Sequence, residues 1–103
     1  MKTEIYLNAS GWRQPVEFYD ALLPKLKSPD WHGKNLNAII DSVVYGEINE
    51  IEPPLTIRVE GLRQAPEPVR SEVEAVRASL LRARAERLQS DGVDRDIEFE
   101  IAD

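Results

Sequence analysis

The sequence contains no cysteine and only one histidine, and these two gaps remove much of the chemistry that proteins perform. Without cysteine there are no disulfides and no thiolate ligands for zinc. A metal site would depend on His32 and carboxylates alone, which is a poor ligand set. We therefore expect no metal and no cofactor, and the lack of cysteine is compatible with a reducing cytosol.

Long apolar runs and basic residues are also scarce. No stretch approaches the roughly 20 apolar residues of a membrane span, and the first residues, MKTEIYLNA, lack the basic and apolar regions of a secretory signal. The 13 lysines and arginines are outnumbered by 19 aspartates and glutamates, which gives a net charge of −6. Direct binding of nucleic acid normally uses a basic surface, so it is disfavoured. We expect a cytoplasmic protein that is attracted to basic proteins, although acidity can also serve solubility alone.

Catalytic motifs are missing as well. There is no glycine-rich phosphate loop, and nothing near His32 supports a Ser-His-Asp or Cys-His arrangement. The glutamates at 47, 50 and 52 stand in a polar, solvated stretch, which is a poor setting for acid–base catalysis. We therefore predict that the protein is not an enzyme. A hydrolase that uses His32 and nearby carboxylates is kept only as the third alternative.

What the sequence does contain is enough for one small domain. Its 103 residues have room for one core and no second, so we expect a single domain over residues 1–103. Three segments alternate apolar and polar residues as half-buried strands do, namely 3–7, 55–59 and 96–101. This alternation predicts a sheet with one buried face and one solvent-exposed face.

Three helical patterns lie between the predicted strands. The first begins at Pro15, and Pro24 should end or bend it. The second covers 35–45 with Gly46 as its stop, and the third covers roughly 68–90. The inner face of the third helix carries the apolar residues Val69, Val73, Val76, Leu80 and Leu88. The order β-α-α-β-α-β, with helical crossovers, predicts a two-layer α/β fold with a three-stranded parallel sheet and helices packed on one face.

The second predicted helix carries a polar stripe opposite its apolar side. On a helical wheel Asn37, Asp41 and Tyr45 recur at every fourth position on the side away from the apolar residues. A solvated face is the ordinary interpretation of such a stripe. Asn35, at the start of the helix, suits the N-cap position.

The loop before this helix favours a binding surface. Trp31 and His32 stand there side by side, followed by Gly33, which allows a sharp turn or the close approach of a partner. A flat ring near a carboxylate that can be desolvated against a cation is what an interface hot spot requires. The ordinary alternatives are that Trp31 covers the end of the core and that His32 is an exposed loop imidazole. The other tryptophan, Trp12, is expected to pack in the core.

The stretch LPKLKSPDWHGKNLNAIIDSVV resembles the signature region of the barstar family, intracellular inhibitors of ribonucleases such as barnase. The segment from Pro29 to Asp41 follows the family pattern without a gap, and the close match covers about a fifth of the chain. The predicted order of strands and helices also fits the family's α/β fold. The resemblance implies that Trp31 packs at the substrate site of a ribonuclease and that Asp41 enters its phosphate-binding pocket.

The resemblance therefore implies a surface that binds a basic ribonuclease, one to one, and occludes its active site. Such an inhibitor would protect the producing cell from its own enzyme or from a delivered toxin, and self-association is left open. The alternative from another class is a small adaptor or regulatory domain with a partner other than a nuclease. The implied partner-binding residues are Trp31, His32, Gly33, Asn35, Asn37, Ile40, Asp41, Tyr45 and Gly46.

The chain departs from the family pattern at several positions. Asn37 stands where the family has a second aspartate, Ile40 where it has a tryptophan, and His32 where it has a second aromatic residue. Ser42 replaces a cysteine, and Ala83 stands where the long helix of the family has a supporting glutamate. These differences predict a target other than barnase itself.

Overall fold

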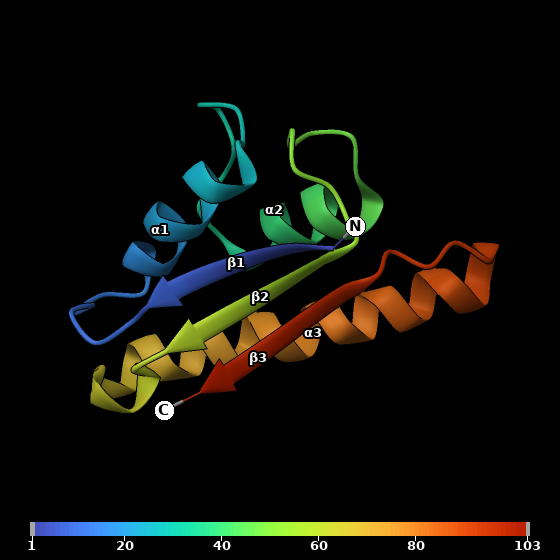
Figure 1. Cartoon of the computed structure of the whole chain (residues 1–103). Coiled ribbons are helices and arrows are strands. Elements are labelled where there is room, and N and C mark those ends of the chain that lie inside the picture. The colour runs from blue at the N-terminus through green and yellow to red at the C-terminus, as the bar shows by residue number, and fades with distance from the viewer. Residues whose placement is uncertain (1, 103) are drawn as a thin grey trace.

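The computed structural model describes residues 2–102 and contains one parallel sheet of three strands (Figure 1). The strands are β1 (Thr3–Asn8), β2 (Leu55–Glu60) and β3 (Ile97–Ala102), in the spatial order β1-β2-β3. Each predicted strand is present, and its ends lie within one residue of the prediction. The parallel pairing expected from the helical crossovers is confirmed.

Helices connect the strands and cover one face of the sheet. They are α1 (Val16–Leu26), α2 (Leu36–Ile40) and α3 (Glu67–Asp91), and a π-helical turn over Asp41–Tyr45 continues α2. A short 3₁₀ turn, Leu62–Gln64, precedes α3. Figure 1 views the sheet from its open face, with β3 crossing in front of α3. The observed order matches the predicted β-α-α-β-α-β.

The core lies between the sheet and the helices. Ile5, Ile57 and Phe99 stand side by side in the strand register and are at most 3% exposed. Phe18 of α1 is fully buried and meets Phe99 with ring centroids 6.3 Å apart. The opposite face is polar, and Arg58 forms ion pairs there with carboxylates of β2 and β3. The sheet is therefore buried on one side only, as the alternation predicted.

Two details of the helices differ from the prediction. Helix α1 does not end at Pro24, which was one of the two outcomes predicted there; it runs to Leu26, because Leu26 is fully buried and its packing offsets the hydrogen bond that proline cannot donate. Leu88 is 47% exposed instead of buried, since the last turns of α3 extend beyond the start of β3 (Figure 1). Residues 2–102 include no helix that is long and apolar enough to cross a membrane.

The loop before α1 is held by one ring and one carboxylate. Trp12 is 8% exposed and packs edge-on against Phe18, with centroids 5.9 Å apart, so the prediction that it belongs to the core is confirmed. The Glu17 carboxylate accepts hydrogen bonds from the backbone N–H groups of Arg13 and Gln14. These donors, that of Arg13 first, hold the pKa of Glu17 below its ordinary value of 4.5.

We expect the substitution Glu17→Gln to make the free energy of unfolding less dependent on pH in the acid range. A carboxylate whose pKa is lowered by folding stabilises the folded state above its unfolded pKa, and this contribution is lost as the pH falls through the lowered value. Glutamine retains an oxygen that can accept both hydrogen bonds but does not titrate. Urea unfolding at pH values between about 7 and about 3 measures the difference. Glu86→Gln, at an exposed position of α3, is the matched control, and an equal change there would contradict this assignment.

Candidate partner-binding site

The polar stripe of the second helix faces solvent. Asn37, Asp41 and Tyr45 are exposed, while the apolar side of the same helix is buried in the core. The amphipathic division predicted for this helix is thus confirmed. Among residues 2–102 the Asp41 carboxylate has no ion pair and no hydrogen bond. Its charge is therefore available to a partner.

The helix that carries the stripe changes its winding at Asp41. The sequence predicted a regular helix, but Asp41–Tyr45 form a π turn, closed by a hydrogen bond of 3.1 Å from Gly46 N to Asp41 O. Gly46 ends the helix as predicted, with φ of 88°, a conformation that favours glycine. Single π turns within α-helices occur frequently at functional sites.

Two arginines from distant parts of the chain hold the end of this π turn. Arg95 donates from Nε to the carbonyl oxygen of Val43 at 3.1 Å, and Arg87 donates from Nη1 to that of Val44 at 2.6 Å. The last carbonyl groups of a helix lack intrahelical donors, so the cations satisfy them and complement the helix dipole. The Arg87 guanidinium also lies 5.5 Å from the ring centroid of Tyr45. Tyr45 is therefore held in place although it is 53% exposed.

The side chain of Trp31 is exposed to solvent. It belongs to the loop over residues 27–35, which we call the Trp31 loop. It is 74% exposed, so the alternative that it covers the end of the core is wrong. Trp31 and Asp41 line one shallow cavity of about 110 Å³. Its other lining residues are His32, Gly33, Ala38 and Ile48, of which Ala38 and Ile48 were not predicted from the sequence. A large ring exposed beside a cavity is typical of a surface that binds another molecule.

The junction between the Trp31 loop and α2 is tightly packed. Asn35 Oδ1 accepts a hydrogen bond of 2.9 Å from Ala38 N, which confirms its predicted role as N-cap. A Cβ atom at Gly33 would lie 2.9 Å from Asn35 Nδ2 and 3.1 Å from the Ala38 Cβ. A larger residue at this position would therefore crowd the Asn35 cap and Ala38, where the loop comes close to the helix.

His32 is buried, which corrects the expectation of an exposed imidazole. It is 6% exposed, with Nδ1 2.7 Å from Gly33 O and Nε2 2.8 Å from Ser42 Oγ. Since both ring nitrogens have polar partners, the ring can be buried at little cost. Ile40, another predicted contact, is half-buried and packs against the core.

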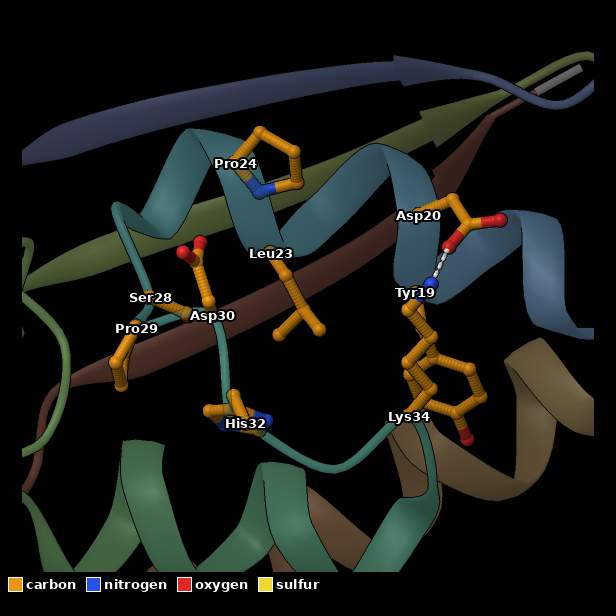
Figure 2. Close-up of a pocket in the computed structure, with 9 residues that line it drawn as sticks. All are labelled: Tyr19, Asp20, Leu23, Pro24, Ser28, Pro29, Asp30, His32 and Lys34. Atoms are coloured by element: carbon orange, nitrogen blue, oxygen red, sulfur yellow. Dashed lines mark ion pairs between the residues drawn. The ribbon is translucent and has the colours of Figure 1, made fainter.

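A hollow of about 350 Å³ separates the Trp31 loop from α1 (Figure 2). Side chains of α1 line one wall, and Asp30 and His32 of the loop line the other. Lys34 and Asp20 bridge the two walls with an ion pair of 2.7 Å. The side of the Trp31 loop that faces α1 thus borders this hollow. In residues 2–102 no group of three or more His, Asp or Glu side chains could hold a metal ion.

Nearly the whole chain matches the model of one known protein family. A family model described as Barstar (barnase inhibitor) matches residues 3–100 of the chain. A comparison with curated proteins gave no match. The matched range runs from β1 into β3 and includes every residue of the candidate site.

Proposed function

The chain belongs to the barstar (barnase inhibitor) family, and on this premise we propose that it inhibits a ribonuclease by occluding the active site. The observation that carries the proposal is one cavity lined both by a tryptophan that is 74% exposed and by the unpaired carboxylate of Asp41. The active site of a ribonuclease is a positively charged cleft built for phosphate. A fixed carboxylate can therefore take the place of the anion of the substrate.

Two kinds of residue make up the proposed surface. Trp31, Asn37, Asp41 and Tyr45 have exposed side chains and contact the partner directly. The others hold the loop and the two ends of the helix in shape, and they are His32, Gly33, Asn35, Ile40 and Gly46. Asn37 keeps a hydrogen-bonding side chain but no charge, which suits a target less basic at this point than barnase.

The proposed inhibitor acts by stoichiometric binding, without turnover or cofactor. Both ring nitrogens of His32 are engaged within the protein, so the hydrolase alternative gains no support from the site. The net charge of −6 attracts a basic enzyme at long range and speeds the encounter. The cytoplasm, where a ribonuclease endangers cellular RNA, is the compartment in which such an inhibitor is needed.

We expect the purified protein to abolish the activity of its cognate ribonuclease at one inhibitor per enzyme. Candidate targets are basic proteins of nuclease size encoded beside it. RNA cleavage is measured with increasing inhibitor, at enzyme concentrations well above the dissociation constant, and the activity should fall linearly to zero at an equimolar ratio. Complete inhibition by much less than one equivalent would contradict occlusion. Binding to a partner at this surface without inhibition of a ribonuclease would favour the adaptor alternative.

A further inference from the structure

Beneath the candidate site lies a network of buried polar side chains. Among the described residues, three of the four buried polar side chains belong to it, namely His32, Ser42 and Asn49, which are 6%, 0% and 6% exposed. His32 Nε2 and Asn49 Nδ2 both contact Ser42 Oγ, at 2.8 and 3.1 Å. Ser28 extends the network at the start of the Trp31 loop, because its hydroxyl donates to Asn49 Oδ1.

The partners of His32 indicate where its proton lies. The carbonyl oxygen of Gly33, 2.7 Å from Nδ1, can only accept, so Nδ1 carries the hydrogen. In the neutral ring Nε2 is then an acceptor. The Ser42 hydroxyl is 2.8 Å from Nε2 but 3.3 Å from the carbonyl oxygen of Ile39, so the histidine is its closer acceptor. A buried network whose members are paired in this way is rigid and specifies one arrangement of the segments that it joins.

Each buried member of the network follows directly, along the chain, a residue that lines the site cavity. The three pairs are Trp31–His32, Asp41–Ser42 and Ile48–Asn49. They come from the Trp31 loop, from the π turn and from the segment between that turn and β2. The inward side chains thus connect the three segments whose outward neighbours form the candidate site.

The other side of the Trp31 loop offers weaker support. Figure 2 shows the hollow between this loop and α1, bridged by the ion pair of Lys34 with Asp20. The two side chains are 55% and 48% exposed, so water screens their attraction. The buried network is therefore a firmer attachment of the loop than this ion pair.

We propose that His32 is a positioning residue, which holds Trp31 beside Asp41 before the partner arrives. Its hydrogen bonds to Gly33 O and Ser42 Oγ order the loop, so that less conformational entropy is lost on binding. His32 does this with almost no surface of its own to offer a partner. The proposal rests on the proposed function, because it takes Trp31 to contact the ribonuclease.

A double-mutant cycle with the cognate ribonuclease tests the coupling. His32→Phe keeps a flat ring but removes both hydrogen bonds. We expect it to weaken binding about tenfold in the otherwise native protein and less than about twofold when Trp31→Ala is also present, because no ring is then left to position. Ser42→Ala, a smaller change that removes the partner of Nε2, should show the same pattern. His32→Gln, whose amide can both donate and accept, should recover part of the affinity. Equal losses with and without Trp31 would overturn the proposal.

A second measurement needs no partner. The chain has two tryptophans, so in Trp12→Phe protein the tryptophan fluorescence, excited selectively, comes from Trp31 alone. We expect His32→Phe to lower the fluorescence anisotropy of Trp31, while Glu86→Gln, at an exposed position outside the buried network, leaves it unchanged. An unaltered anisotropy in His32→Phe would overturn the positioning role, whatever the partner is. If the anisotropy falls but the native protein inhibits no ribonuclease, the positioning role stands and the proposed function fails.

Discussion

Replacing Asp41 with alanine is expected to weaken the complex with the cognate ribonuclease by about 2–5 kcal/mol, which is a loss of affinity of about 30-fold to several thousand-fold. In the free protein the carboxylate is exposed and unpaired among the described residues, so it loses its water only when cations of the partner replace that water. Alanine leaves those cations buried without a counter-charge, and this accounts for much of the cost. The magnitude is the general one for truncating one member of a buried charge pair at a protein interface.

Two further variants separate the charge from other effects. Asp41→Asn keeps the size of the side chain and removes its charge, so it should lose most of what alanine loses. Asp30→Asn is the matched control, because Asp30 is also exposed but points into the hollow beside α1 (Figure 2). It should change the binding free energy by less than about 1 kcal/mol. Calorimetry or inhibition of RNA cleavage gives the affinities. Native affinity in Asp41→Ala would rule out mimicry of a substrate phosphate.

The sheet could be predicted because a half-buried strand repeats its burial at every second residue. Leu55, Ile57 and Val59 share one face in the sequence pattern, and all three are 0% exposed. The information is local, so no knowledge of the remaining chain was needed. The helical crossovers then fixed the parallel direction of the strands.

Features that depend on distant residues could not be predicted. The carbonyl groups that end the π turn are bound by Arg87 and Arg95, which lie 43 and 52 residues beyond their acceptors Val44 and Val43. Helix α1 continues past Pro24 for a similar reason, since burial of Leu26 in the core outweighs a local rule. A pattern read from neighbouring residues does not contain these contacts.

Part of the local structure around the candidate site could be predicted, and the role of its residues stays a prediction. The resemblance and the helical wheel identified Trp31 and Asp41, which the structure places beside one cavity. His32 was expected to be exposed. Its burial depends on an acceptor of Gly33 and on the hydroxyl of Ser42, which lies ten residues further along the chain. The contact with Ser42 is not visible in the spacing of neighbouring residues. Ile48 lies in a segment without regular apolar spacing, outside the stretch from Pro29 to Asp41 that follows the family pattern.

Trp31 and Trp12 are expected to respond oppositely to truncation. Trp31→Ala should weaken the complex by about 2–4 kcal/mol and change the free energy of unfolding by less than about 0.5 kcal/mol, since the residue is 74% exposed in the free protein. Trp12→Ala should lower the free energy of unfolding by about 3–5 kcal/mol, because its ring is buried against Phe18. The folded fraction of Trp12→Ala should bind the ribonuclease with nearly native affinity.

Urea unfolding and binding, measured on the same preparations, test this pair of expectations. The binding constants must refer to folded protein, so the folded fraction is determined first by circular dichroism. Trp31→Phe, which keeps a ring, should lose less affinity than Trp31→Ala. A larger loss of affinity in Trp12→Ala than in Trp31→Ala would move the interface to the loop before α1. An exposed indole contributes little to the free energy of unfolding, but its apolar surface gains by leaving water when a partner covers it. Truncation of a contact residue must therefore reduce binding without reducing the stability of the fold.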